Sequence, residues 1–244
     1  MQTKAKLRFF ARLAHYEADV ELADVFKRAI KSKELESSSL LFTYADKKRH
    51  PRLCNRAVSK QNREIAVGHL NNTIRVSFIK DLYEDFLEYL SEILRAAARN
   101  GLNAGRLIGS HKFSVDANHI LEKKTWEEII NSVADDLFRE LEKKKKTVKL
   151  VEDIDKKLGL NLDKRTINAA MPYLEIRHLY VHRDGICDEL FSKSYPILKL
   201  KNGDNINPSY DLVKKAKNTI HKLVNHIDER VLHYNIVGAD DKMK

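Results

Sequence analysis

The feature that most constrains the fold is a long amphipathic segment from Asn72 to Asn100. Its apolar residues recur at steps of three and four, which places them on one face of an α-helix. The helix should stop at Asn100-Gly101, because glycine accepts the left-handed conformation that closes a helix. This is the strongest helical pattern in the chain, and its stripe consists of Ile79, Leu82, Tyr83, Phe86, Leu87, Leu90, Ile93, Leu94 and Ala97.

Four further helices are expected after it. Thr125 and Glu128 form a capping box, a helix start in which the two side chains satisfy backbone donors, and the helix should run to about Lys146. A short helix should follow from Val148 to Leu158, ending at Gly159. The last two are expected from Asp163 or Asn168 to about Gly185, with Pro172 in the first turn or at a kink, and from about Ser209 to Tyr234.

The remaining segments are less regular. Residues 6–31 should be helical with a break near Asp19, and Leu40 to Tyr44 could be a short extended piece or the start of a helix. Phe191 to Asn207 should be an irregular connection. The fold class is therefore all-α, an antiparallel helical bundle over 67–237. An N-terminal, mostly helical extension over 1–66 precedes it, and a polar, frayed tail over 238–244 follows it.

Composition favours a globular helical protein with a polyanionic partner. Of the 244 residues, 43% are hydrophobic and 33% are charged, with only eight glycines and four prolines. The formal net charge of +10 favours nucleic acid through counterion release and steering. Cys54 and Cys187 have no neighbouring cysteine, so reduced thiols and a cytoplasmic location are expected. No segment has the apolar length of a signal peptide or a membrane span.

The densest uncompensated charge lies between residues 47 and 63, which hold seven basic residues and no acid. Such a segment could follow a phosphate backbone and bind nucleic acid. A run of like charges is also typical of a solvated face, so both interpretations stay open. The basic segment comprises Lys47, Lys48, Arg49, Arg52, Arg56, Lys60 and Arg63.

The stretch from Glu175 to Gly185 carries the most chemistry. On an ideal helix Glu175, His178 and His182 fall within about 60° of one another and form a polar stripe. Arg177 lies about 140° from His182, on the apolar side of the helix. A guanidinium there needs a partner or a wet cleft, because an unpaired buried charge is very costly.

Two interpretations of Arg177 follow. In the structural one, Arg177 pairs with a carboxylate from another helix and the histidines lie on the surface. In the functional one, Arg177 and His182 converge on one phosphate, which ideal helix geometry does not achieve unaided. Long arginine reach, helix termination near Asp184 and Gly185, or a second copy of the chain would have to bring them together.

At these residues the sequence resembles the HEPN superfamily, in particular the prokaryotic ribonuclease-like branch (RiboL-PSP or MAE type) found among toxin and defence proteins. The mark of the family is an arginine, a polar residue, and a histidine four to six residues after the arginine, within an all-helical bundle. Here it consists of Arg177, His178 and His182, and the context from Glu175 to Gly185, Asp188 and Phe191 also fits. The resemblance covers roughly residues 72–234.

The resemblance implies a metal-independent endoribonuclease without cofactors, in a homodimer whose two motifs face each other. His182 would act as general base or acid for attack of the ribose 2′-hydroxyl, and Arg177 would stabilise the developing charge. His178 stands where the family often has asparagine, and its supporting role is shared with Glu175, Arg183 and Asp184. RNA, an antitoxin or a defence-system component would be the partners.

Two other functions remain open. A non-catalytic HEPN module that binds nucleic acid, nucleotide or a partner protein would need the same bundle and charge. A helical scaffold component of a larger defence assembly would need only the bundle. Both Arg177 and His182 are present, which favours the enzyme.

Overall fold

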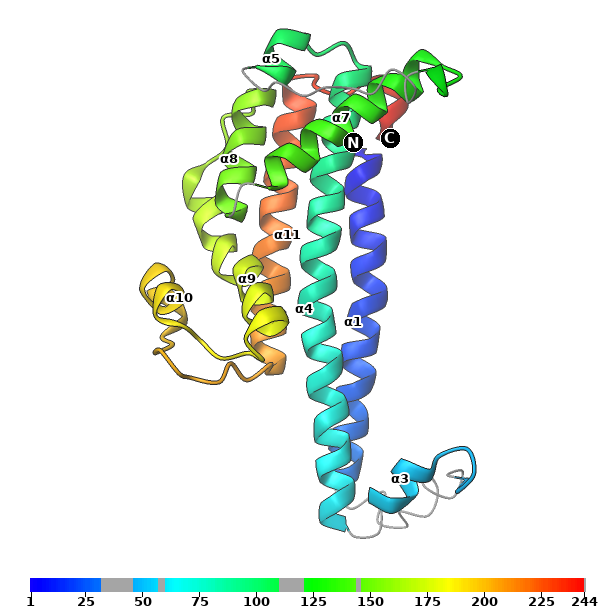
Figure 1. The fold of residues 1–244 in the computed structure, drawn as a ribbon, viewed down its shortest axis with the longest axis vertical. Coiled ribbons are helices and arrows are strands. Elements are labelled where there is room, and N and C mark those ends of the chain that lie inside the picture. The colour runs from blue at the N-terminus through cyan, green and yellow to red at the C-terminus, as the bar shows by residue number, and fades with distance from the viewer. Residues whose placement is uncertain (32–45, 57–59, 110–120, 144–145, 244) are drawn as a thin grey trace.

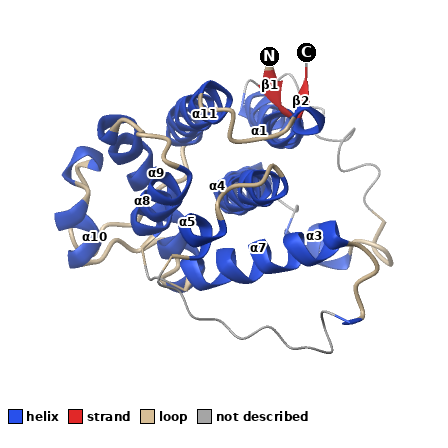
Figure 2. Ribbon diagram, turned by 90° about the horizontal axis from the view of Figure 1, so that it is seen from above, coloured by secondary structure: helices blue, strands red, loops and turns tan. Residues whose placement is uncertain are grey.

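The computed structural model describes residues 1–31, 46–56, 60–109, 121–143 and 146–243, in which helices dominate (Figure 1). A single pair of two-residue strands is the only sheet in this part of the chain (Figure 2). The all-α class is therefore confirmed. Residues 40–44, where an extended piece or a helix start was expected, lie outside the described ranges. No described helix combines the length and the apolar character needed to cross a membrane.

The central element is α4, Lys60–Arg99, which contacts α1, α7, α8, α9 and α11. Its predicted stripe is largely buried, with Phe86 and Leu94 fully so. Its stop is also confirmed, because Gly101 adopts a φ of 78° and the Leu102 N–H donates to the Ala97 carbonyl at 3.1 Å. The helix begins twelve residues before Asn72, since it continues packing against α1 there.

Helix α1, Lys4–Lys31, lies antiparallel along α4 (Figure 1). The expected break near Asp19 is wrong. Asp19 points to solvent while its neighbour Val20 is buried, so the apolar face continues through this position, and no glycine or proline interrupts it. Helix α1 shares one hydrophobic core with the bundle through Ala5, Phe9, Leu13 and Val20. Helix α4 likewise runs across the boundary drawn between residues 66 and 67.

Two helices cover another side of α4. Helix α7, Trp126–Glu142, starts as predicted, because the Thr125 hydroxyl accepts from the Glu128 N–H at 3.2 Å. It ends at Glu142, before the predicted Lys146. Helix α8, Thr147–Leu158, ends at Gly159, whose φ is 63°. The five-residue α5, Ala104–Ile108, packs against α8.

The helix of the arginine and histidine residues is α9, Lys164–His182, which packs against α4, α8 and α11. Its N-cap is Asp163, the first of the two predicted starts, which accepts from the Arg165 and Thr166 N–H groups. Pro172 lies inside the helix and not in its first turn. Helix α11, Tyr210–His233, is capped by Ser209, as predicted.

The connection between α9 and α11 is more ordered than expected. It contains α10, Glu189–Ser194, and a 3-10 helix η1, Pro196–Leu198. Phe191 and Ile206 are buried and anchor the connection to the bundle. An isolated β-bridge between Ile186 and Asn205 closes it at its base.

The two ends of the chain lie together (Figure 2). Strand β1, Gln2–Thr3, pairs antiparallel with β2, Lys242–Met243, after a 3-10 helix η2, Ala239–Asp241. The frayed tail expected from residue 238 is therefore wrong over its described part. Strand β1 is also attached to α11, because the Thr3 hydroxyl donates to the buried Asp228 carboxylate at 2.5 Å. Burial raises the pKa of Asp228, against the opposing effect of that hydrogen bond.

Candidate functional site

The candidate site lies where the C-terminal half of α9 meets α4 and the start of α8. Leu174, Ile176 and Leu179 turn inward and fix the rotation of α9 on the bundle. That rotation sends the ionisable side chains to the flanks and the outer face, as the predicted helical periodicity requires. The order of apolar residues along α9 thus determines where each charged group lies.

Arg177 projects toward α4. Its Nη2 donates to the Glu84 Oε1 at 2.6 Å, and its guanidinium carbon lies 4.8 Å from the centroid of the Tyr83 ring. The Arg177 side chain is 29% exposed and that of Glu84 is 56% exposed. The Nε of Arg177 is buried and has no hydrogen-bond acceptor among the described residues. Arg177 therefore has the carboxylate partner of the structural interpretation, held through its Nη2.

Glu175 projects toward α8, where the Thr147 N–H donates to its Oε1 at 3.0 Å. The N-cap residue of α8, Lys146, makes no side-chain cap of its own. A carboxylate at a helix N-terminus satisfies a free donor and complements the helix dipole. Glu175 therefore caps a neighbouring helix.

A small pocket of about 130 Å³ lies between these groups. Burial raises the pKa of Tyr83, and the hydrogen bond with Thr147 and the charge of Arg177 oppose that rise. The pocket is mixed in charge, since two carboxylates and two cations line it. Its lining includes Tyr83, Glu142, Lys146, Thr147, Glu175, Arg177 and His178.

His178 and His182 lie one turn apart on the solvent-facing side of α9, with their ring centroids 4.7 Å apart. This part of the predicted polar stripe is present. No hydrogen bond or ion pair joins Arg177 to His182 among the contacts of the described residues. Within one copy of the chain, Arg177 and His182 are therefore not in direct contact.

The residues after His182 form the turn that ends α9. Arg183 is exposed and lies 3.7 Å from the Asp188 carboxylate. Asp184 is exposed with a φ of 51°, and Gly185 is buried with a φ of 78°. The Gly185 N–H donates to the Leu179 carbonyl at 3.0 Å, which closes the helix where the sequence predicted.

The basic segment lies elsewhere, at the far end of the α1 and α4 pair (Figure 1). Lys47, Lys48 and Arg49 are exposed in a turn, and Arg52 is exposed on α3, Pro51–Arg56. Arg56 ends α3, while Lys60 and Arg63 belong to the first turn of α4. Within one chain the two groups of candidate residues are thus separate.

Sequence reasoning missed Tyr83 and Glu84 as parts of the site. Tyr83 was predicted to belong to the apolar stripe of α4. Its ring does pack there, but the prediction did not include its contact with the Arg177 guanidinium. The sequence did show that Arg177 needs a partner, because a charge on the apolar side of a helix must be paired. It could not show that this partner is Glu84, which lies 93 residues away.

The fold and the site together define an all-α protein with an arginine, two exposed histidines and a small charged pocket at one helix end. Comparisons of the chain with protein-family models, with curated proteins and with solved structures found no match.

Proposed function

We propose that the protein is a metal-independent endoribonuclease of the HEPN type, acting as a toxin or in phage defence. The observation that carries the proposal is the exposed pair of His178 and His182 on the same turns of α9 as Arg177. An imidazole exchanges protons near neutral pH, and a guanidinium binds a phosphate through a planar fork of donors. These are the groups needed for cleavage by the ribose 2′-hydroxyl.

In the proposed step, His182 accepts the proton of the 2′-hydroxyl as its oxygen attacks the neighbouring phosphorus. The new P–O2′ bond forms while the P–O5′ bond breaks, and a protonated imidazole gives the leaving oxygen its proton. Arg177 stabilises the charge that develops on the phosphate. The products are a 2′,3′-cyclic phosphate and a free 5′-hydroxyl.

The proposal requires a homodimer, because Arg177 and His182 leave α9 about 140° apart. Two copies whose sites share a cleft would let the arginine and histidine groups act on one RNA strand. An antitoxin or a defence-system partner would bind this same dimer.

The test is cleavage of RNA by the purified full chain in the presence of a chelator, with analysis of the product ends. Wild type should leave 2′,3′-cyclic phosphates, and His182→Ala and Arg177→Ala should each lose activity by about 100-fold or more. His15→Ala removes an exposed histidine on α1 and serves as the matched control. Full cleavage by either motif variant would refute the mechanism.

A second candidate is a non-catalytic HEPN-like module that binds nucleic acid, nucleotide or a partner protein. The ion pair between Arg177 and Glu84 favours it, because this guanidinium already has an anion. Salt-dependent RNA binding without cleavage would support this candidate. Induced expression of wild type beside His182→Ala separates the two, since only an enzyme should arrest growth and fragment RNA in a His182-dependent way.

A further inference from the structure

His178 and His182 are a pair of histidines at the spacing of a helical chelate. Among the ten histidines of the chain, they are the only two separated by three or four residues. That spacing places two side chains on one face of a helix, one turn apart. In α9 both rings are exposed, and their centroids lie 4.7 Å apart with an angle of 50° between the ring planes. The two imidazoles therefore border the same small region of solvent.

The ring nitrogens of this pair are available to a ligand. Within the described part of the chain, neither ring makes a hydrogen bond or an ion pair with another residue. His226 differs, because its Nε2 accepts a hydrogen bond from the Asp163 N–H at 3.0 Å. His178 and His182 can therefore each offer a lone pair to a metal ion, which binds neutral imidazole.

The separation of the two rings fits a shared metal ion. With metal–nitrogen bonds of about 2.0–2.1 Å and a ring centre roughly 1.15 Å behind the nitrogen, two imidazoles on one ion have ring centres about 4.5 Å apart when the bonds meet at about 90°, and about 5.2 Å apart at the tetrahedral angle. The observed 4.7 Å lies between these values. Because both rings are exposed and rotation about χ2 of histidine is soft, the nitrogens can turn toward one ion without a change in the backbone.

Helix α9 holds the pair in this position. Leu179, which lies between the two histidines in the sequence, is buried and fixes that turn of the helix on the bundle. The N–H groups of Arg183 and Gly185 both donate to the Leu179 carbonyl, at 2.9 and 3.0 Å, so the last turn is closed directly after His182. A chelating pair on a rigid element loses little conformational freedom when it binds.

The chemistry of the donors selects the ion. Neutral imidazoles suit Zn²⁺, Cu²⁺ and Ni²⁺, whereas Mg²⁺ and Ca²⁺ take oxygen ligands. No cluster of three or more His, Cys, Asp or Glu side chains that could hold a metal ion occurs among the described residues. Glu175, one turn before His178, is directed to the start of α8, where it accepts from the Thr147 N–H. Water molecules therefore complete the ligand shell of an ion held by the two histidines.

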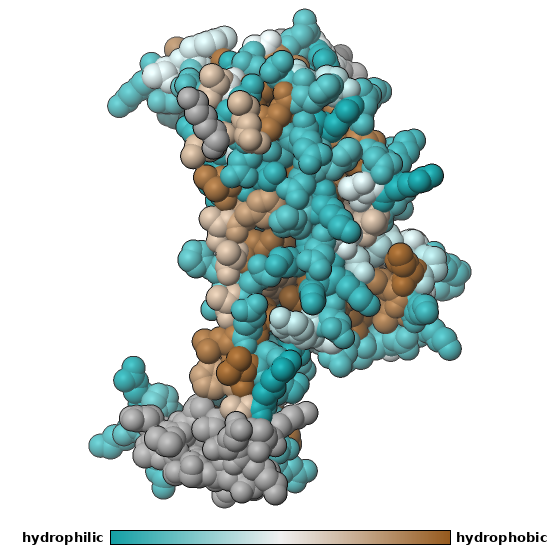
Figure 3. Space-filling view, turned by 180° about the vertical axis from the view of Figure 1, so that it is seen from behind, coloured by the Kyte–Doolittle hydropathy of each residue, from teal (hydrophilic) through white to brown (hydrophobic). Residues whose placement is uncertain are grey.

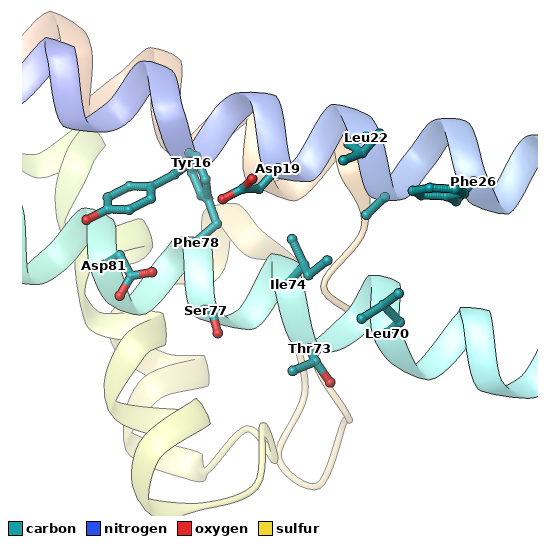
Figure 4. A pocket seen from close by; sticks show the side chains of 11 residues that line it. Tyr16, Asp19, Leu22, Phe26, Leu70, Thr73, Ile74, Ser77, Phe78 and Asp81 are labelled. Atoms are coloured by element: carbon teal, nitrogen blue, oxygen red, sulfur yellow. The ribbon is translucent and has the colours of Figure 1, made fainter. Parts of the chain in front are cut away.

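An apolar groove between α1 and α4 offers donors of another kind (Figure 4). It has a volume of about 400 Å³, and Figure 3 shows apolar side chains along this outer part of the helix pair. The carboxylates in its lining are those of Asp19 and Asp81. Carboxylate oxygens suit Mg²⁺ and Ca²⁺ better than ions of the zinc class. Asp81 is therefore an acidic control outside the histidine pair.

We propose that His178 and His182 chelate one divalent transition-metal ion of the class of Zn²⁺, Ni²⁺ and Cu²⁺. Each neutral imidazole replaces one water molecule of the hydrated ion. The binding itself does not rest on the proposed function, but one consequence does. Neutral imidazole has a single acceptor nitrogen, so a metal ion on that nitrogen of His182 takes the lone pair that would accept the 2′-hydroxyl proton. The ion is then an inhibitor of RNA cleavage, and a chelator removes it.

The first test is titration of the untagged, chelator-treated full chain with Zn²⁺ by isothermal titration calorimetry. Wild type should bind one ion per chain. His178→Ala and His182→Ala should each raise the dissociation constant at least about 10-fold, since even groups outside a ligand shell contribute that much. His15→Ala on α1 and Asp81→Asn should keep the wild-type affinity, and excess Mg²⁺ should not compete. A wild type that does not bind, or an affinity that the two α9 variants leave unchanged, would overturn the proposal.

The second test asks whether the folded helix presents the pair. A ligand that binds the folded chain more tightly than the unfolded chain stabilises it. Zn²⁺ should therefore move the urea midpoint of wild type to a higher concentration and leave that of His178→Ala unchanged. The same curves show that each variant is folded. A wild-type midpoint that does not respond to Zn²⁺ would show that α9 does not preorganise the pair, which would also overturn the proposal.

An RNA assay separates this inference from the proposed function. Cleavage that Zn²⁺ stops and a chelator restores would support both. Zinc binding that depends on His178 and His182, in a chain that never cleaves RNA, would leave the metal site standing without the ribonuclease. Cleavage that persists when the site is saturated with Zn²⁺ would exclude His182 as the base and leave the metal site intact.

Discussion

Glu84 of α4 accepts a hydrogen bond of 2.6 Å from Nη2 of Arg177 on α9, across 93 residues of sequence. The pair lies at an open face, since more than half of the Glu84 side chain is exposed. In the free protein the Glu84 carboxylate accepts a hydrogen bond from the Arg177 guanidinium. A phosphate bound by Arg177 would use the same donor. Glu84 is therefore a competitor of any anion that Arg177 binds.

Removing that competition should strengthen RNA binding. We expect Glu84→Gln to lower the dissociation constant for a short single-stranded RNA several-fold at fixed salt, measured by fluorescence anisotropy. The free energy of unfolding should change by no more than about 1 kcal/mol, because exposed ion pairs contribute little. Glu152→Gln, which alters an exposed pair on α8, is the control. An unchanged affinity in Glu84→Gln would show that Arg177 does not contact RNA.

Glu175 should contribute to stability mainly through its hydrogen-bonding oxygen and less through its charge. Glu175→Ala leaves the Thr147 N–H without its acceptor and should cost about 1 kcal/mol, as for other lost caps. Glu175→Gln keeps an acceptor oxygen and should cost less. Urea denaturation of the three proteins measures both effects. Equal losses in the two variants would contradict the capping role.

Gly185 should not tolerate a side chain. Its φ is 78°, and a Cβ built there would lie 3.1 Å from Cε1 of Tyr180. Gly185→Ala should therefore lower the free energy of unfolding by about 1–2 kcal/mol. Gly68→Ala is the matched control, because Gly68 lies inside α4 with nothing within 4 Å of the added Cβ, so alanine should be neutral or stabilising. A tolerant Gly185 would mean that the turn after His182 readily adopts another conformation.

The N-cap of α9 should make stability depend on acid. Hydrogen bonds from the Arg165 N–H, and then from Thr166, hold the pKa of Asp163 below its ordinary value of 3.8. A carboxyl with a lowered folded pKa stabilises the protein above its unfolded pKa and loses that contribution as pH falls through the folded value. The difference in unfolding free energy between wild type and Asp163→Asn should thus shrink below pH 3.8.

Urea denaturation at a series of pH values measures this difference. Ser209→Ala removes an uncharged cap from α11, and its cost should stay constant over the same range. A pH-independent difference for Asp163→Asn would show that the carboxylate charge is not stabilised at the cap.

Helix α1 should unfold together with the rest of the bundle. Phe9 is buried in the common core, so Phe9→Ala should cost about 3–5 kcal/mol. Unfolding followed by circular dichroism should remain a single transition at a lower urea concentration. Two separate transitions would instead show that α1 and the remaining helices are independent units.

The elements predicted best are those with local signals. Thr125, Gly159 and Ser209 mark helix ends through interactions with residues only a few positions away, and each was located correctly from sequence. The break expected near Asp19 was wrong because an exposed acid can lie within a continuous helix whose apolar face runs on beside it. The tail after Gly238 was misjudged because its order depends on β1, at the other end of the chain.

The site shows the same limit. The helical periodicity around Glu175 predicted the outward pair of His178 and His182, and it identified Arg177 as a charge in need of a partner. It could not identify Glu84 or the capping of α8 by Glu175, because both depend on how distant helices pack. The ribonuclease activity and the dimer remain predictions.

The length of α4 has a mechanical consequence. At about 1.5 Å per residue its 40 residues span roughly 60 Å, and its N-terminal part extends beyond the other long helices except α1 (Figure 1). Such a helix pair is a lever arm. A tilt of the helix pair by about 5° beside Arg177 would move α3 by roughly 3 Å. A small angular change at the candidate site thus becomes a displacement of atomic size at the far end of α1 and α4.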